Sequence, residues 1–349
     1  MIARMTCRAA VAFGVMVALG CNPERHWELR TELHALDVPD HVSNYLGVEL
    51  TPPTRAQVGL GRHLFHDRQL SLDGSVSCAS CHMQGRGFSD PNALSIGVNG
   101  GQSDRNAMAL VNLVFDPLLF WDGRVSSLKE QAFLPVVHPL EMAESWPDVV
   151  AKLQSDERYP QMFFEAFGSS EVDSNRVAEA LAAFETTLLS FDSPYDAFFY
   201  GGKADALNES AFRGFELFFG EAECVHCHAG PLLTDQTFKS NGLDGTVTDP
   251  GLGEVTGDAQ DLGKFKVPTL RNIAVTGPYM HDGRFSSLME VVEHYNSGVN
   301  SQAPNLDPDM HIYVEGLQLS EQDKLDLVAF MESFTDTTFL TNEAFSAPN

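Results

Sequence analysis

Two copies of one short motif constrain this chain of 349 residues more than any other feature. Residues 78–82 are Cys-Ala-Ser-Cys-His and residues 224–228 are Cys-Val-His-Cys-His, which is the spacing that attaches c-type haem. The two thiols form thioether bonds to the haem, and the adjacent histidine ligates the iron. A zinc site is the alternative, but zinc needs no histidine directly after each cysteine pair. We therefore predict two covalent haem c groups on Cys78, Cys81, Cys224 and Cys227, with His82 and His228 as iron ligands.

The first 20 residues are typical of an export signal. Two arginines precede the apolar run Ala9–Leu19, which is too short to span a bilayer. The run ends in Ala-Leu-Gly-Cys at residues 18–21, which resembles a bacterial lipoprotein cleavage box with Cys21 as the lipidated residue. An ordinary signal peptide cut nearby is the alternative. We expect residues 1–20 to be removed, and the mature protein to be periplasmic with membrane contact only through a lipid on Cys21.

The charge balance excludes one class of partner. Lys and Arg total 22 and Asp and Glu total 48, which gives a formal net charge of −26. A chain this acidic repels nucleic-acid phosphates, so we expect no nucleic-acid binding. A basic protein partner remains compatible with this charge.

Sequence elements around the two motifs recur, which indicates an internal repeat. The Gly and Phe of Gly61–Phe65 reappear in Gly214–Phe218, and residues 121–128 match residues 281–288 at six of eight positions. Two related modules with one haem each account for this pattern. We expect an N-terminal haem domain at 21–195 and a C-terminal one at 196–319, with the segment from about 320 to 349 packing back on the first.

The hydrophobic spacing is mainly helical, and strand signals are weak throughout. A helix is predicted behind Ser174 as its N-cap, and capping boxes are predicted at Ser287–Glu290 and Ser320–Asp323. The stretch 241–263 is rich in Gly, Asp and Thr, so we expect an exposed loop that borders the second haem or contacts a partner. The predicted fold is mainly α: two cytochrome c-like haem domains with long loops and little β.

The sixth iron ligand decides what each haem can do, because an open site can bind peroxide and a second strong ligand makes an electron carrier. Tyr295 follows Leu288 at i+7, so it shares the buried face of the predicted helix. A buried core tyrosine is the ordinary alternative for such a residue. Met280, Met289 and Met310 are rival ligands of the usual cytochrome kind.

Several motifs occur in a specific order between about residue 50 and residue 335. They are the two haem motifs, Phe120–Arg124, Gln131, Pro135, Glu141–Met142, Pro268–Asn272 and Pro278–Gly283. Together they resemble the bacterial di-haem cytochrome c peroxidase and MauG family. The resemblance implies that the N-terminal haem is peroxidatic and the C-terminal haem transfers electrons.

The resemblance also implies roles for individual residues. Glu141 matches the carboxylate that moves a proton as peroxide is cleaved, and Gln131 and Pro135 match positions in the same distal pocket. Trp121 matches a tryptophan between the haems that relays electrons. The ordinary alternatives are a solvated acid for Glu141 and core packing for Trp121. Asn106, with the backbone carbonyls of Thr276 and Pro278, matches a calcium site between the domains.

Two positions depart from the peroxidases of this family. Residues 97–102 contain no histidine, whereas those peroxidases carry one here that blocks the peroxidatic haem until the other haem is reduced. We therefore expect an open first haem in the resting ferric enzyme. Tyr295 stands where the second haem of those peroxidases has a methionine ligand, and the resemblance implies that MauG-like members also have a tyrosine here. A phenolate ligand stabilises ferric iron.

Three functions follow from these features. The first is a peroxidase that reduces hydrogen peroxide with electrons from a small cytochrome c or cupredoxin. The second is a MauG-like enzyme that uses peroxide to oxidise Trp or Tyr residues of a partner protein. The third is a non-enzymatic di-haem electron carrier, against which Glu141 and Gln131 argue. A homodimer is compatible with all three.

Overall fold

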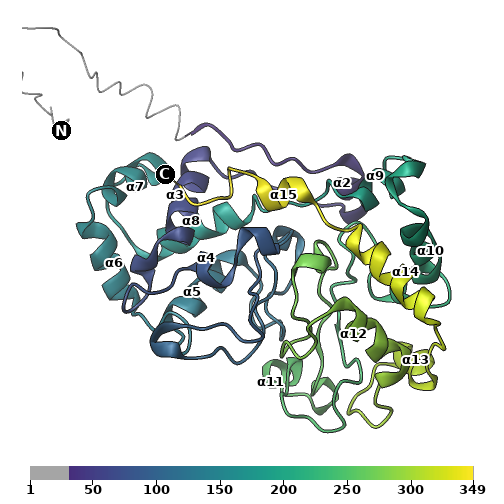
Figure 1. Ribbon diagram of the computed structural model, residues 1–349. Helices are drawn as coiled ribbons and strands as arrows, with labels where there is room; N and C mark the ends of the chain where they lie inside the picture. Colours follow the sequence, from purple (N-terminus) through teal and green to yellow (C-terminus); the bar gives the residue numbers. More distant parts are fainter. Residues whose placement is uncertain (1–30, 349) are drawn as a thin grey trace, which may run out of the picture.

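The computed structural model of the protein describes residues 31–348, which are mainly helical (Figure 1). The predicted signal segment and Cys21 lie outside the described residues. The α-helices of the described part are α2 (Asp40–Leu46), α3 (Arg55–His66), α4 (Cys78–Cys81), α5 (Leu128–Val137), α6 (Trp146–Ser155), α7 (Tyr159–Phe167), α8 (Ser174–Glu185), α9 (Pro194–Phe199), α10 (Glu209–Phe219), α11 (Leu252–Thr256), α12 (Leu288–Glu293), α13 (His311–Glu315), α14 (Glu321–Glu332) and α15 (Thr337–Thr341). Between residues 31 and 348, no helix has the length and apolar character that crossing a membrane requires.

The two strands that the structure describes, β1 (Phe238–Lys239) and β2 (Phe265–Lys266), pair antiparallel. Phe238 stands opposite Lys266, and Lys239 opposite Phe265. The prediction of a mainly α fold with little β is therefore confirmed.

Side-chain caps begin several of the helices. Both predicted capping boxes are present: Ser287 Oγ accepts the amide of Glu290 at 3.3 Å, and Ser320 Oγ accepts that of Asp323 at 3.2 Å. The prediction for α8 is wrong by one residue. Asp173, in an extended conformation, accepts the Arg176 amide at 2.9 Å, so Ser174 is already the first helical residue.

The repeated glycines mark the same helix crossing in each half of the chain. A Cβ on Gly61 of α3 would lie 2.6 Å from the Ala180 carbonyl carbon of α8, and a Cβ on Gly214 of α10 would meet the Asp326 carbonyl of α14 in the same way. Figure 1 shows α3 with α8 on one side of the molecule and α10 with α14 on the other. Each half is thus built on one pair of helices, and the two helices approach each other so closely that only glycine fits where they cross.

Two asparagines repeat the same hydrogen bonds behind these helix pairs. Asn112 and Asn272 both adopt left-handed backbone conformations, with φ of 59° and 61°. The amide of Asn112 donates to Leu188 O, just past α8, and that of Asn272 donates to Phe334 O, just past α14. The internal repeat in the sequence is therefore a repeat of three-dimensional structure.

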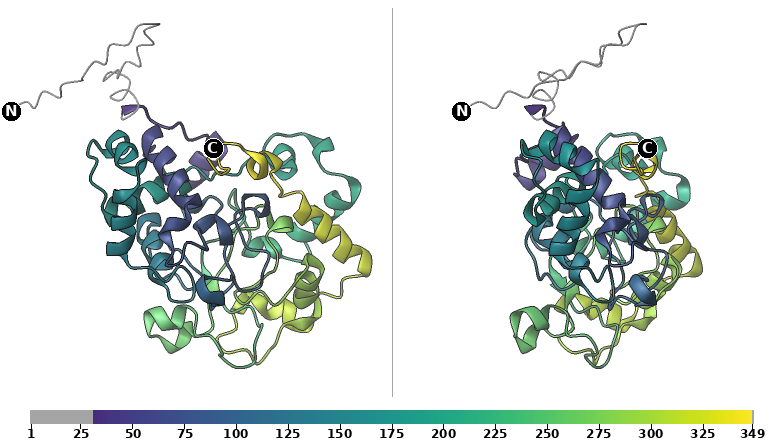
Figure 2. Two further views of the ribbon diagram at one scale, coloured as in Figure 1. Left: turned by 60° about the vertical axis from the view of Figure 1, so that its left-hand side comes forward. Right: turned by 90° about the vertical axis from the view of Figure 1, so that its left-hand side faces the viewer.

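Each half has its own hydrophobic cluster, and both ends of the described chain cross between the halves. The first cluster is built on α3 and α5–α8 and the second on α9, α10, α12 and α14. After α14, the chain returns so that Phe339 and Phe345 pack in the first cluster. Before α3, His41 of α2 stacks on Tyr200 of the second half at 3.9 Å between ring centroids. The two halves lie side by side in Figure 1, and the first half lies in front of the second in the right-hand view of Figure 2. The domain limits at 195 and 319 stay a prediction.

Candidate active site and its two cavities

Each haem motif places its cysteines and histidine around one cavity. Cys78 and Cys81 are the first and last residues of α4, and Cys224 begins a short 3-10 turn, Cys224–His226. All four cysteines are free thiols. Cys78, Cys81 and His82 line a cavity in the first half. Cys224, Cys227 and His228 line a cavity in the second half.

The two histidines are held in the orientation that an iron ligand needs. Nδ1 of His82 donates to Phe88 O at 2.8 Å, and Nδ1 of His228 donates to Leu233 O at 3.1 Å. Burial lowers the pKa of both rings, which keeps them neutral. With Nδ1 occupied, Nε2 carries the free lone pair of each ring. The cysteines, the neutral histidines and the two cavities together fit two covalent haem groups.

The first cavity gathers the three predicted distal residues. Gln131 and Pro135 lie one turn apart on α5, and Glu141 follows this helix; all three line the cavity with His82. The loop predicted to lack a blocking histidine packs directly on Glu141: Val98 N donates to Glu141 O at 2.8 Å. A Cβ on Gly97 would lie 2.7 Å from Glu141 Cα, so this loop contacts the site through bare backbone.

Charged groups around Glu141 adjust its protonation. Burial raises its pKa, and the nearby His138 and Arg124 oppose this effect. Glu141 also lines an open cleft whose walls include Trp121, Arg124 and His138. The carboxyl group therefore lies between the haem site and a route to solvent.

One buried acid on the first cavity has no sequence signal. Glu185, at the end of α8, lines the cavity, and its Oε2 has no hydrogen-bond partner. Burial raises the pKa of Glu185 to about 8, so it is largely protonated at neutral pH.

Tyr295 lies on the wall of the second cavity, but not in the helix expected for it. The α-helix ends at Glu293, and residues His294–Gly298 form a π-helical turn, a feature frequent at functional sites. Leu288, Val291 and Tyr295 still line the same cavity. Burial raises the pKa of Tyr295 to about 12, so its phenol is neutral in the absence of a metal.

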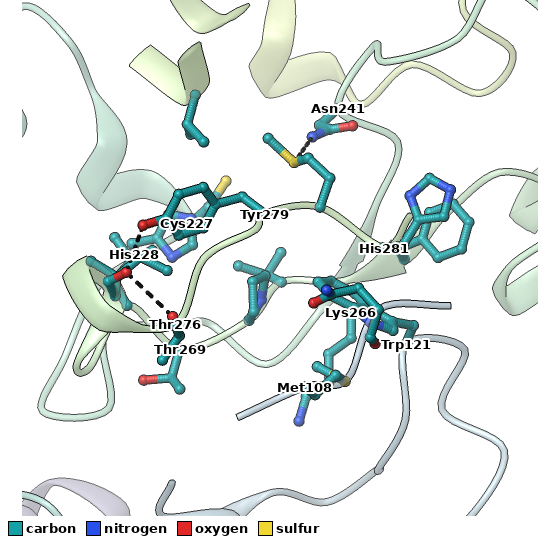
Figure 3. Close-up of a pocket in the computed structure, with 18 of the residues that line it drawn as sticks. Met108, Trp121, Cys227, His228, Asn241, Lys266, Thr269, Thr276, Tyr279 and His281 are labelled. Atoms are coloured by element: carbon teal, nitrogen blue, oxygen red, sulfur yellow. Dashed lines mark hydrogen bonds between the residues drawn. The ribbon is translucent and has the colours of Figure 1, made fainter. Parts of the chain in front are cut away.

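The rival ligands differ in their positions. Met280 and Met310 line the second cavity with Tyr295, and Met289 does not. The Asn241 amide links two of the candidates, because its Nδ2 donates to Tyr295 Oη at 3.3 Å and to Met280 Sδ at 3.6 Å. Figure 3 shows Asn241 joined by a dashed line to this sulfur. Asn241 begins the segment 241–263, which was expected to border the second haem or contact a partner, but its hydrogen bond to Tyr295, 54 residues away, was not predicted.

Trp121 lies between the two sites, since it lines both the open cleft of the first half and the cavity of the second. Its Nε1 donates to Asn106 O at 2.9 Å, and its carbonyl accepts the Lys266 amide at 2.8 Å. Trp121, Lys266 and His281 appear on one side of the cavity in Figure 3. The ring of His281, its counterpart in the repeat, stacks instead on Phe265 at 3.7 Å.

The three residues expected to bind calcium all line the second cavity. The Asn106 side-chain nitrogen donates to Ala93 O at 3.0 Å, which leaves the amide oxygen for a cation. Residues 31–348 contain no group of three or more His, Cys, Asp or Glu side chains suited to a metal ion.

The segment 241–263 borders both sites. Its residues Leu243 and Asn241 line the second cavity, and Asp249 and Glu254 line the open cleft of the first half. Arg105 holds it in place: Nε and Nη2 donate to the Asp249 carboxylate at 2.7 and 2.8 Å, and Nη1 pairs with Asp122. In Figure 2, α11 projects from the second half beneath the first.

Comparison with known proteins agrees with this geometry. The family model described as di-haem cytochrome c peroxidase matches residues 55–204. The methylamine utilization protein MauG of Methylorubrum extorquens is 37% identical over 285 residues, which cover 81% of this chain and 79% of that protein. The chain belongs to the di-haem cytochrome c peroxidase family.

Other members of the di-haem cytochrome c peroxidase family support the assignment. The cytochrome c551 peroxidase of Nitrosomonas europaea is 39% identical over 248 residues, covering 70% of this chain and 74% of that protein. The crystal structure of a MauG-like protein associated with microbial copper homeostasis is 33% identical, with a TM-score of 0.80, and covers 90% of this chain and 99% of that one. This family member is thus an oxidoreductase of the cytochrome c peroxidase type, and its family supports the two haem c groups.

Proposed function

We propose that this protein reduces hydrogen peroxide at a haem held by its first half, with electrons that enter through a haem held by its second half. The observation that carries the proposal is the meeting of Gln131, Pro135 and Glu141 with Cys78 and His82 around one cavity. The electron donor is a small cytochrome c or cupredoxin, and the net charge of −26 favours a basic one.

Residues of this chain handle the protons of the reaction. When bound, the haem iron supplies the electron-transfer chemistry that cleaves the O–O bond. Glu141 takes a proton from one oxygen of peroxide and delivers it to the other, and its raised pKa suits both tasks. The Gln131 amide orients peroxide by hydrogen bonds, and the backbone of residues 97–101 closes the pocket without a blocking side chain.

The test is Glu141→Gln, which keeps the shape of the side chain and removes its acid–base function. We expect kcat/KM for peroxide to fall by about 100-fold or more, with an unchanged ferric absorption spectrum. Glu216→Gln, on the exposed face of α10, is the matched control. Full activity of the Glu141 variant would refute the proposed role.

Trp121 is the proposed electron relay, because it lines both the open cleft of the first half and the cavity of the second. Trp121→Phe keeps an aromatic ring, but phenylalanine is harder to oxidise than tryptophan and cannot donate the hydrogen bond to Asn106 O. We expect slower electron transfer between the haems, measured by rapid mixing of the half-reduced enzyme with peroxide. An unchanged rate would exclude the relay.

A MauG-like activity is the second candidate, in which peroxide oxidises Trp or Tyr residues of a partner protein. Tyr295 and its bond from Asn241 on the second cavity favour it. The decisive experiment is stopped-flow absorption of the diferric, calcium-loaded protein with one equivalent of peroxide and no donor. A long-lived near-infrared band supports the MauG-like function. No reaction until one haem is reduced refutes it and the open first haem. If Tyr295 ligates the second haem, Tyr295→Phe should alter the low-spin spectrum of that haem, and an unchanged spectrum would exclude this ligand.

The remaining proposals concern calcium and location. We propose one Ca²⁺ at Asn106, Thr276 and Pro278 and expect a chelator to slow electron transfer between the halves. We also propose export to the periplasm with a lipid on Cys21. Cys21→Ala should move the protein from the membrane fraction to the soluble periplasmic fraction, and an unchanged distribution would exclude the anchor.

A further inference from the structure

A histidine and an exposed acid extend outward from the proposed acid–base residue. His138 is the residue that caps the C-terminus of α5, three positions before Glu141. Its Nδ1 lies 3.5 Å from Glu141 Oε1, and its Nε2 lies 3.7 Å from Asp104 Oδ2. The Asp104 side chain is 75% exposed, whereas those of His138 and Glu141 are each 33% exposed. The three side chains therefore form a line from solvent to the first cavity.

The ring of His138 is not satisfied by its surroundings. Nδ1 is buried and has no hydrogen-bond partner. Buried ring nitrogens are normally paired, and an exception requires an explanation such as a catalytic role or an ordered water. Both carboxylates lie slightly beyond the usual hydrogen-bond length, a separation that a small movement of the ring closes.

We propose that His138 is a proton relay that resupplies Glu141 from solvent, with the Asp104 carboxylate orienting its outer nitrogen. This inference rests on the proposed function of Glu141. His138 contacts neither haem nor peroxide in this scheme, so it acts through Glu141 alone.

The stoichiometry of the reaction requires such a supply. Hydrogen peroxide, two electrons and two protons give two molecules of water, and the electrons come from the donor protein. Glu141 can move protons that are already on peroxide, but the two additional protons must come from solvent. In each transfer, Nε2 of His138 gains a proton from water, and Nδ1 loses one to the Glu141 carboxylate. The ring keeps its charge, and exchange of its nitrogen-bound protons with solvent restores the starting tautomer.

Other charged groups on the open cleft are already engaged. Arg105 is paired with Asp122 and Asp249 and lies 3.9 Å from Glu254, and Arg124 is paired with Asp122. Arg124 also acts on Glu141, where it favours the carboxylate. Among the groups that face Glu141, His138 is thus the one imidazole, a ring that can carry a proton on either of its two nitrogens.

The experiment compares His138→Asn and Asp104→Asn with the native holoenzyme. The first readout is peroxide reduction as a function of pH, with its solvent deuterium isotope effect. The second is the rate at which cyanide binds the diferric protein, because hydrogen cyanide must lose a proton to a nearby base as it binds. His311→Asn is the control, since His311 is exposed and bonds Pro308 O at 3.2 Å.

We expect His138→Asn to slow peroxide reduction and cyanide binding roughly tenfold. This is less than the loss of about 100-fold or more that removal of the acid–base group itself causes, because water takes over part of the proton transfer. The Asp104 variant should show a smaller effect of the same kind. Rising phosphate concentration at fixed pH should restore the rate of the His138 variant and leave the native rate unchanged. A merely structural role would not give this buffer rescue.

Two outcomes would overturn the relay. The first is native rates and isotope effects in His138→Asn. The second is a slower variant that buffer does not rescue, or whose ferric spectrum has changed, because the ring would then only support the pocket. Glu141→Gln separates the two proposals: if it lowers the rates and His138→Asn does not, the relay alone fails. If neither variant changes the rates, the proposed function fails with it.

Discussion

The close crossing of α3 and α8 makes a sharp prediction for Gly61→Ala. The added Cβ would lie 2.6 Å from the Ala180 carbonyl carbon and 2.9 Å from Phe184 Cβ, whereas real contacts stay beyond about 3.0 Å. Both neighbours belong to a helix, so they cannot rotate away. Overpacking of this kind costs about 1–3 kcal/mol and exceeds the helix-propensity gain of roughly 1 kcal/mol. We expect a net destabilisation of up to about 2 kcal/mol, or up to roughly 8 °C in the Tm of this half.

Gly59→Ala is the matched control, because it lies in the same helix and its Cβ would meet nothing within 4 Å. It should raise the Tm slightly through helix propensity alone. Thermal unfolding of the holoproteins by circular dichroism measures both variants. If Gly61→Ala is as stable as Gly59→Ala, the two helices do not cross as closely as the structure has them.

Three further predictions concern the second cavity, the helix pair of the second half and the segment 241–263. Asn241→Leu removes the hydrogen bond from Asn241 to Tyr295 Oη. If Tyr295 Oη ligates the iron, it donates more strongly to the iron without this bond, so the reduction potential of that haem should fall by about 20–60 mV. Spectroelectrochemistry measures this potential, and an unchanged value would exclude the hydrogen bond. The ion pair with α10 lowers the pKa of Asp326 to about 2, so Asp326→Asn should cost about 1–2 kcal/mol at neutral pH. This cost should shrink as the pH falls below about 4 and vanish only below about 2, where the carboxylate is protonated in both the folded and the unfolded state. Urea unfolding at several pH values measures the cost, and a cost that stays constant with pH would contradict the prediction. Arg105→Gln should speed proteolytic cleavage within 241–263, and an unchanged cleavage rate would show that other contacts hold this segment.

Local chemistry explains why the haem motifs could be predicted. A haem attachment motif needs two thiols and a histidine within five residues, so its spacing is complete in the sequence. The capping boxes at Ser287 and Ser320 are local for the same reason. At α8, two adjacent polar residues compete for the N-cap, and only the extended backbone of Asp173 shows which one holds it.

Contacts between distant segments could not be predicted. Tyr295 was expected on an α-helix, but the chain changes to a π-helical turn there, which hydrophobic periodicity does not encode. His138 was one of several isolated histidines in the sequence. Its spacing of three residues from Glu141 was the available signal, and Asp104, 34 residues earlier, had none.

The sequence by itself determined the cofactor chemistry, the mainly helical class and the repeat, because each depends on residues close together in the chain or on a recurring pattern. Only the tertiary structure decided that Gly61 and Gly214 mark equivalent helix crossings. It alone brought Asn241 to Tyr295 and the segment 241–263 to Arg105. The physical reason is that these contacts join segments separated by long loops, whose closure depends on the packing of the whole molecule.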